Sequence, residues 1–296
     1  MIQDKNIQKR CIAVLITVHN RKATTIECLR HLFQCQHMRE DLDVYMVDDG
    51  CTDGTPECVK ELFPDVHVIS GTGQLYWNRG MHLAWTEALK SEYDFYLWLN
   101  DDTFLYKNAI EMMLNVYSNV REDSIIAGPT CCTSNPKTVT YGGLVKSRLL
   151  IPDGNVQEID QFWGNIVLVP HKAVEKIGIL DPYFCHTMGD SEYSFRAKRH
   201  GIHMYITPSF CGECDLHSDI PVWQNPHYSV IERLKYLHSP LGNPPCQLFY
   251  LYSKYKSFIF AASVVLMIYL ITLLPNAAPK AIGWVKKTVK AGRIRI

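Results

Sequence analysis

The first hundred residues alternate between short apolar runs and longer segments with helical spacing, and this alternation restricts the fold most. Cys11 to Val18 is an apolar run of strand-forming residues, Asn20 to Gln36 has apolar residues at helical spacing, and Val44 to Val47 is a second apolar run. The same pattern then predicts a helix at Thr55 to Leu62, a strand at Val66 to Ile69, a helix at Arg79 to Lys90 and a strand at Phe95 to Leu99. Such an order predicts a mainly parallel sheet with helices on both faces.

The rest of the chain is less regular. We expect strands at Ile125 to Gly128 and Trp163 to Val169, and helices at His171 to Gly178 and Tyr193 to His200. A stretch rich in proline and glycine, Pro240 to Pro245, then separates the globular part from an apolar and basic tail. We therefore expect a catalytic domain over 1–227, a linker and helical extension over 228–256, and a membrane-associating tail over 257–296.

Composition excludes some classes of protein. A hydrophobic content of 47% in 296 residues is that of a globular chain with a sizeable core, and a net charge of zero gives no reason to expect nucleic acid as a partner. The eleven cysteines are irregularly spaced, which indicates a reducing compartment, and we interpret Cys211 and Cys214 as packed thiols rather than zinc ligands. No apolar stretch near the N-terminus resembles a secretory signal, so we expect a cytoplasmic catalytic part.

Two acidic pairs directly follow predicted strands. Asp48 and Asp49 come after the second strand, and Asp101 and Asp102 come after the strand that ends at Leu99. Ligands of open parallel sheets bind beyond the carboxyl ends of the strands, so both pairs are expected at one site. Clustered carboxylates are costly unless a cation neutralises them, and a hard divalent cation shared with nucleotide phosphates fits this pattern. Turns rich in Asp and Gly also form for conformational reasons alone.

Four motifs resemble those of a known family. They are Thr17-Val18-His19-Asn20-Arg21, Val47-Asp48-Asp49-Gly50, Asn100-Asp101-Asp102 and Gly189-Asp190-Ser191-Glu192. Their order and approximate spacing resemble inverting glycosyltransferases of family 2, over about Cys11 to His217. The resemblance implies an α/β fold with a GT-A type nucleotide-binding sheet flanked by helices, here followed by a hydrophobic and amphipathic helical tail. The segment Gly71 to Gly80 also resembles a loop of bacterial rhamnosyltransferase-like members of polysaccharide assembly.

The resemblance assigns the donor and metal residues. It places Thr17 and His19, the latter where relatives have Tyr, at the nucleotide base with Asp49, and Asp101 at the ribose or donor sugar. It also implies nucleotide-sugar contacts for Asn20, Arg21 and Gly73, and makes Asp102 and His217 ligands of Mg²⁺ or Mn²⁺. The metal would neutralise the leaving diphosphate.

The catalytic base must accept a proton from an acceptor hydroxyl, which a carboxylate can do. Asp190 matches the base of the family, whereas Gly189 stands where relatives have Glu. The alternative is that Asp190 or Ser191 caps the helix that follows. Glu192 and Arg196 are spaced for an ion pair within a helix. The acceptor side implied by the resemblance comprises Trp163, Gly164, Asn165 and Glu192, and we expect Trp98 in the core.

The tail predicts membrane attachment. Ser257 to Leu274 is uncharged and at the lower limit of a spanning helix, and the residues after Pro275 carry basic but no acidic side chains. A single span would place these cations outside, against the positive-inside tendency. We therefore expect peripheral or monotopic attachment to the inner face of the cell membrane through the apolar segment and a basic amphipathic helix. A hairpin buried in a homodimer is the alternative.

These expectations define one function and two alternatives. The chain is predicted to be an inverting, metal-dependent glycosyltransferase of the hexosyltransferase type in cell-surface polysaccharide synthesis. It would move rhamnose or another deoxyhexose from a nucleoside-diphosphate donor to a lipid-linked saccharide. A sugar-nucleotide nucleotidyltransferase would need a glycine-rich basic loop after the first strand, where His19-Asn20-Arg21 stands. A non-catalytic, membrane-associated glycan-binding protein would not need Asp102 and Asp190.

Overall fold

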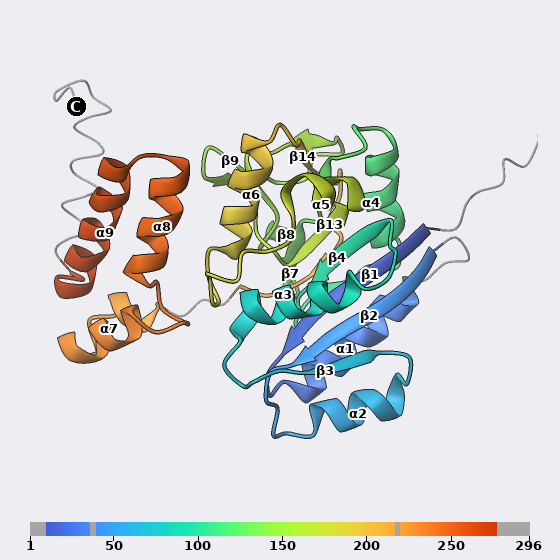
Figure 1. Cartoon of the computed structure of the whole chain (residues 1–296), viewed down its shortest axis with the longest axis horizontal. Helices are drawn as coiled ribbons and strands as arrows, with labels where there is room; N and C mark the ends of the chain where they lie inside the picture. The colour runs from blue at the N-terminus through green and yellow to red at the C-terminus, as the bar shows by residue number, and fades with distance from the viewer. Residues whose placement is uncertain (1–9, 36–39, 217–219, 277–296) are drawn as a thin grey trace, which may run out of the picture. The chain divides into compact units, whose positions relative to one another are not determined.

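The computed structural model describes residues 10–35, 40–216 and 220–276. The chain divides into two compact units, with the boundary between Leu216 and His217. The first contains the sheets and the motifs singled out above, and the second is helical (Figure 1).

The first unit is built on a mixed sheet with the strand order β11-β14-β6-β13-β4-β1-β2-β3. Its strands are β1 (Arg10–Val18), β2 (Glu40–Asp48), β3 (His67–Ser70), β4 (Phe95–Leu99), β6 (Ile125–Ala127), β11 (Gln157–Glu158), β13 (Ile166–Pro170) and β14 (Met204–Ile206). Its helices are α1 (Lys22–Gln34), α2 (Thr55–Leu62), α3 (Tyr76–Ala88), α4 (Ala109–Ser118), α5 (His171–Ile177) and α6 (Gly189–Arg199). The strand and helix order predicted for the first hundred residues is confirmed.

Two smaller sheets accompany the main one. The first has the order β10-β9-β12, with β9 (Gly143–Val145), β10 (Arg148–Leu149) and β12 (Gln161–Phe162). The second has the order β5-β15-β7-β8, with β5 (Phe104–Leu105), β7 (Thr130–Cys132), β8 (Asn135–Val139) and β15 (Gly212–Glu213). These short strands lack a long apolar run, which is why the sequence pattern does not predict most of them.

The strand register brings the predicted polar clusters to one edge. In the parallel strands, Val18 pairs with Asp48, and Asp48 pairs with Ser70. Parallel β4 lies on the other side of β1, so its carboxyl end reaches the same edge. The turns that follow β1, β2, β3 and β4 therefore leave the sheet side by side, where ligands of such sheets bind.

The sheet departs from the predicted parallel arrangement at one central strand. β13 lies between β4 and β6 and is antiparallel to both. It starts where β4 ends, because Ile166 pairs with Leu99. The residues just before β13 consequently lie beside the Asn100-Asp101-Asp102 turn, and the backbone N–H of Asn100 donates to the carbonyl oxygen of Asn165.

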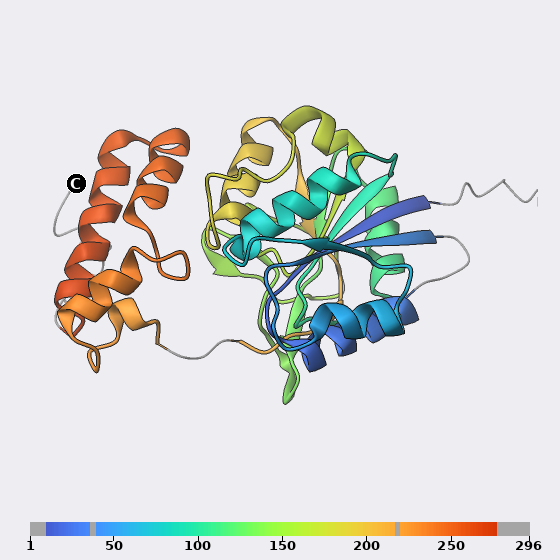
Figure 2. The same cartoon turned by 60° about the horizontal axis from the view of Figure 1, so that its bottom comes forward.

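Two apolar layers cover the two faces of the sheet. On one face α1, α2 and α4 pack residues such as Leu29, Val59 and Met113 against the strands. On the other face α3, α5 and α6 contribute Trp85, Ala173 and other apolar side chains. Figure 2 shows α1 and α2 on the face opposite α3. Helices on both faces and the core position of Trp98, which is fully buried, are confirmed.

The second unit is helical. Its described elements are η1 (Val222–Gln224), α7 (Val230–Leu237), α8 (Pro245–Tyr255) and α9 (Phe258–Leu273). Arg233 of α7 is buried and donates to the carbonyl oxygen of Thr272 in the last turn of α9. It thus supplies a hydrogen-bond donor to a carbonyl that has no partner within that helix. Within the described residues no helix is both long and apolar enough to cross a membrane. The predicted basic amphipathic helix falls in 277–296, outside the described residues.

Candidate functional site

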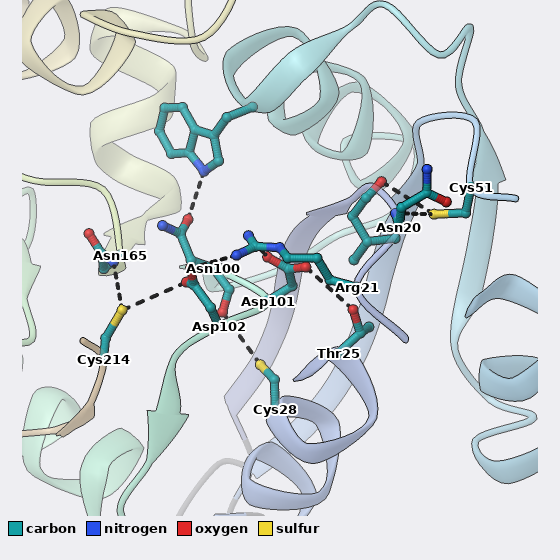
Figure 3. Close-up of polar contacts among 12 residues, drawn as sticks. Asn20, Arg21, Thr25, Cys28, Cys51, Asn100, Asp101, Asp102, Asn165 and Cys214 are labelled. Atoms are coloured by element: carbon teal, nitrogen blue, oxygen red, sulfur yellow. Dashed lines mark hydrogen bonds and ion pairs between the residues drawn. The ribbon is translucent and has the colours of Figure 1, made fainter. Parts of the chain in front are cut away.

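The acidic turn after β4 is held together by Arg21. The Arg21 guanidinium donates from Nη2 to Asp101 Oδ1 at 2.5 Å and from Nη1 to Asp102 Oδ2 at 2.8 Å (Figure 3). Arg21 lies just before α1, at the carboxyl edge of the sheet. One cation therefore offsets part of the charge of two adjacent carboxylates, which lowers the cost of clustering like charges. Three of the predicted site residues are brought together here.

The two carboxylates have different surroundings. The Asp101 side chain is 2% exposed and also accepts a hydrogen bond from Thr25 Oγ1 of α1. Its burial raises the pKa of the carboxyl to about 6, with a further increase from Asp102 and an opposing decrease from Arg21. The Asp102 side chain is more exposed, at 16%. Asp101 is thus the interior member of the pair, and Asp102 is the member that a ligand can reach.

Three side chains that sequence reasoning did not assign to the site surround this turn. The Trp77 indole donates to Asn100 Oδ1 at 2.7 Å, and its ring packs edge-on against Trp98. The Cys214 thiol lies 3.7 Å from Asp102 Oδ1 and accepts a hydrogen bond from Asn165 Nδ2 (Figure 3). Cys28 of α1 donates to the carbonyl oxygen of Asn100. No local pattern marks these residues, because their roles depend on contacts between distant elements.

Asp49 organises the loop between β3 and α3. Its carboxylate is buried, and it accepts hydrogen bonds from the backbone N–H groups of Gly73 at 2.7 Å, Leu75 at 2.9 Å and Tyr76 at 2.9 Å. Gly73 has a φ of 81°, and its Cα would lie 2.8 Å from a Cβ at Gly50. The glycines therefore allow two turns to approach each other closely, and Asp49 ties them together.

We expect Asp49→Ala to weaken nucleotide binding more than it slows chemistry. The substitution leaves three backbone N–H groups without their acceptor and loosens the loop beside the proposed base site. Without this anchor the loop must be ordered when the nucleotide binds, and a loss of about tenfold in nucleotide affinity, about 1.4 kcal/mol, is expected. Calorimetric titration with UDP, GDP and dTDP would measure it. Unchanged affinity for the nucleotide that the wild type binds would contradict the assignment.

The turn after β1 is fastened to its neighbours. His19 Nδ1 lies 2.7 Å from the carbonyl oxygen of Asp49, and the side-chain oxygen of Asn20 accepts from the Thr52 backbone at 2.7 Å. Thr17 faces α3, where a Cβ on Gly80 would lie 2.5 Å from its hydroxyl oxygen. The structure thus brings His19 and Asp49 together, whereas Asn20 joins two turns and Thr17 packs beneath α3. Their contacts with a nucleotide stay predictions.

Asp190 is linked to the acidic turn through the start of β13. Asp190 Oδ2 accepts from the Gly164 backbone N–H at 3.3 Å, and Oδ1 accepts from the Ser191 N–H at 2.7 Å. The residue after Gly164, Asn165, bonds to Asn100. A side chain at Gly164 would meet the Trp77 ring at 2.7 Å, so this glycine lets Trp77 and Asp190 approach the same segment. Removal of the carboxyl from water raises the pKa of Asp190.

The helix-cap alternative does not describe this geometry. Helix α6 already begins at Gly189, with Met188 as its N-cap at a φ of 72° and no side-chain cap hydrogen bond. Asp190 therefore lies in the first turn, where the helix dipole favours a carboxylate. A Cβ at Gly189 would lie 1.8 Å from Asn78 Oδ1. Asn78 of α3 thus fills the space that the family's additional Glu side chain would need.

The remaining acceptor-side residues lie mostly inside the protein. Glu192 is fully buried and pairs with Arg196 at 2.6 Å, which confirms the predicted ion pair. Asn165 is also buried, whereas Trp163 is half-buried and packs edge-on against Tyr141. Of this set, Trp163 is the aromatic residue, and it directly precedes the Gly164–Asn165 segment that links Asp190 to Asn100. Acceptor contacts by these residues stay predictions.

The predicted metal ligands are only partly described. His217 lies outside the described residues, and among the described ones no three His, Cys, Asp or Glu side chains converge as a ready metal site. Asp102 fits a hard divalent cation, because it supplies a partly exposed carboxylate at the carboxyl edge of the sheet. Such an ion would take its other ligands from the phosphates of a nucleotide.

A comparison with models of protein families shows the family of the chain. The model for glycosyl transferase family 2 matches residues 13–178, more than half of the chain. The chain belongs to glycosyl transferase family 2. The match includes the turns around Asp49 and Asp102 and ends before Asp190.

Solved structures show the same fold at low sequence identity. S. aureus TarS, residues 1–349, has a TM-score of 0.53 and 9% identity, with 90% of this chain and 72% of that chain covered. A mannosyltransferase from Pyrobaculum calidifontis, PcManGT, solved with GDP-Man and Mn²⁺, has a TM-score of 0.53 and 15% identity, covering 94% and 80%. A comparison with curated protein sequences gave no significant match. This family 2 domain therefore has the GT-A type α/β fold that the sequence predicts.

Proposed function

We propose that the chain is an inverting, metal-dependent glycosyltransferase that moves a sugar from a nucleoside-diphosphate donor to a saccharide acceptor. One observation carries this proposal. The Gly164–Asn165 segment joins Asp190 and the Asn100-Asp101-Asp102 turn by hydrogen bonds, so a candidate base and a candidate metal ligand belong to one site. A glycan-binding protein would need neither group. Family membership supports the same reaction class.

The residues divide the reaction between two ends of the site. Asp102 would hold Mg²⁺ or Mn²⁺, which neutralises the leaving diphosphate. The Asp49-anchored loop and His19 would hold the base, and Asp101 would contact the ribose or the donor sugar. Asp190 would accept the proton of the attacking acceptor hydroxyl, and its raised pKa suits a general base better than that of an ordinary carboxylate. His217 would be a further metal ligand.

The donor class is proposed from the loop between β3 and α3. The segment Gly71 to Gly80 resembles that of rhamnosyltransferase-like members, so we propose a dTDP-linked deoxyhexose as donor. PcManGT was solved with GDP-Man and Mn²⁺, which supports a nucleotide-sugar and a divalent metal but a different sugar. Incubating the full chain with Mn²⁺ and dTDP-, UDP- and GDP-sugars, and measuring nucleoside diphosphate release, tests the proposal. No release from any donor, with lipid-linked acceptors supplied, would contradict it.

The described tail supports a proposal of monotopic membrane attachment. Ile259, Leu266, Leu270 and Leu273 lie on one face of α9, and they are 81%, 61%, 43% and 43% exposed. The opposite face, with Ala261, Ile268 and Thr272, is buried. An exposed apolar stripe along a helix without charged residues suits the acyl boundary of a bilayer. A lipid-linked acceptor would be presented at that surface, in cell-surface polysaccharide synthesis on the inner face of the membrane.

We expect Ile259→Asp together with Leu266→Asp to reduce binding to vesicles several-fold. A carboxylate placed at the acyl boundary of a bilayer is unfavourable. A carboxylate on a surface that does not contact lipid should leave the binding to vesicles unchanged. Co-sedimentation with phosphatidylglycerol vesicles measures the bound fraction. Ile151→Asp, at a residue 61% exposed in the first unit, is the matched control. Equal vesicle binding by all variants would contradict attachment through this face of α9, and a wild-type dimer that the double variant dissociates would favour the homodimer instead.

A further inference from the structure

Arg21 is the cation that pairs with both carboxylates of the acidic turn. The guanidinium spans both carboxylates, with Asp101 buried and Asp102 partly exposed. The Arg21 side chain is itself 42% exposed, so it can be reached from solvent. Arg21 follows Asn20, whose φ of 51° and hydrogen bond to Thr52 fix the backbone of the turn. The backbone of Arg21 is thus held in place, and its side chain extends to Asp101 and Asp102.

Arg21 forms an ion pair with Asp102, the proposed metal ligand. Asp102 Oδ2 is the acceptor of Arg21 Nη1 at 2.8 Å. A divalent cation on the same carboxylate would lie close to the guanidinium, and two cations at that distance repel each other. A guanidinium fork also fits phosphate oxygens as well as it fits carboxylates. Arg21 can leave Asp102 and still keep its hydrogen bond to Asp101.

From these contacts we infer that Arg21 is a built-in counter-ion that occupies Asp102 in the donor-free protein and releases it to the metal when a nucleoside diphosphate binds. The inference rests on the proposed function, since it assumes that Asp102 is the metal ligand. It makes metal and donor binding interdependent: the metal alone competes with Arg21, whereas the diphosphate offers the guanidinium another anionic partner. The acidic turn has a cationic partner in both states.

The test is Mn²⁺ binding, which needs no catalysis. Electron paramagnetic resonance counts free Mn²⁺ in the presence of the full chain at low ionic strength, without nucleotide. We expect Arg21→Gln to bind Mn²⁺ at least about tenfold more tightly than the wild type, because the competing cation is gone. Arg30→Gln removes an exposed cation from the neighbouring helix α1, where it pairs with Glu27, and is expected to leave affinity unchanged. Equal affinity in Arg21→Gln and wild type would overturn the inference.

Two further variants separate this inference from the proposed function. In Arg21→Gln with Asp102→Asn, the gain in Mn²⁺ affinity should disappear, and an undiminished gain would show that the metal binds elsewhere and contradict the proposed site. Adding UDP, GDP or dTDP should tighten Mn²⁺ binding by a larger factor in the wild type than in Arg21→Gln. If Arg21→Gln fails to fold, Arg21→Lys serves instead, because one ammonium cannot span both carboxylates. Its Mn²⁺ affinity should exceed that of the wild type, and equality would overturn the inference.

Discussion

Asp190→Asn is expected to nearly abolish transfer while leaving donor and metal binding intact. The amide keeps the shape of the carboxyl but cannot accept the proton of the acceptor hydroxyl. A general base contributes about 10²- to 10⁴-fold to a rate, so transfer should fall by that factor. The base acts only as charge develops on the acceptor oxygen, and its loss should therefore appear in kcat and not in donor affinity.

The fold should tolerate Asp190→Asn. The amide oxygen can still accept from the Ser191 N–H, and the substitution removes only the longer hydrogen bond from the Gly164 N–H. A decrease of about 1 kcal/mol in the free energy of unfolding is expected. The matched control is Asp160→Asn, which removes a carboxylate that pairs with Lys198 at the far end of α6. Transfer, calorimetry and melting should be measured together. Retained transfer with normal melting would show that the base lies elsewhere.

Asp102→Asn is expected to lower turnover by about a hundredfold or more at saturating donor. The leaving diphosphate loses the counter-charge that Asp102 holds in place, and such charge stabilisation contributes several kcal/mol to the transition state. The Arg21 ion pair to Asp102 is partly exposed, so its weakening should cost no more than about 1 kcal/mol of stability. Turnover is measured over a Mn²⁺ titration, with melting as the control for folding. A folded variant that keeps full activity in chelator would contradict the metal role of Asp102.

The sequence predicts the central layers of this fold well, because long apolar runs decide them. β4 and α2 have the predicted bounds, whereas β2 starts earlier, at Glu40. The early part of β2 pairs with β1 alone, since β3 first pairs at Tyr45, and charged residues are tolerated there. The antiparallel direction of β13 is not predictable from the sequence for a different reason. The direction of β13 depends on the path of the chain through the short strands that precede it, and no apolar pattern in the sequence indicates that path.

The sequence suggests candidate residues for the site, but it does not predict their contacts. Motif order marks Asp49, Asp102 and Asp190 as candidates, and adjacency at strand ends predicts that acidic groups gather. The pairing of Arg21 with both carboxylates and the anchoring of a loop by Asp49 depend on tertiary distances. The helix containing Asp190 also begins earlier than the apolar pattern suggests. Met188 adopts a left-handed conformation, which lets the polar Gly189-Asp190-Ser191-Glu192 segment enter α6.

The most direct test of the proposed mechanism is time-resolved proton NMR of the wild-type reaction with Mn²⁺, an acceptor and the donor that releases nucleoside diphosphate. A metal-dependent, inverting transfer with Asp190 as base predicts a product whose anomeric configuration is opposite to that of the donor. It also predicts that no product forms when chelator replaces Mn²⁺. A product with the configuration of the donor, or undiminished product formation in chelator, would contradict the account.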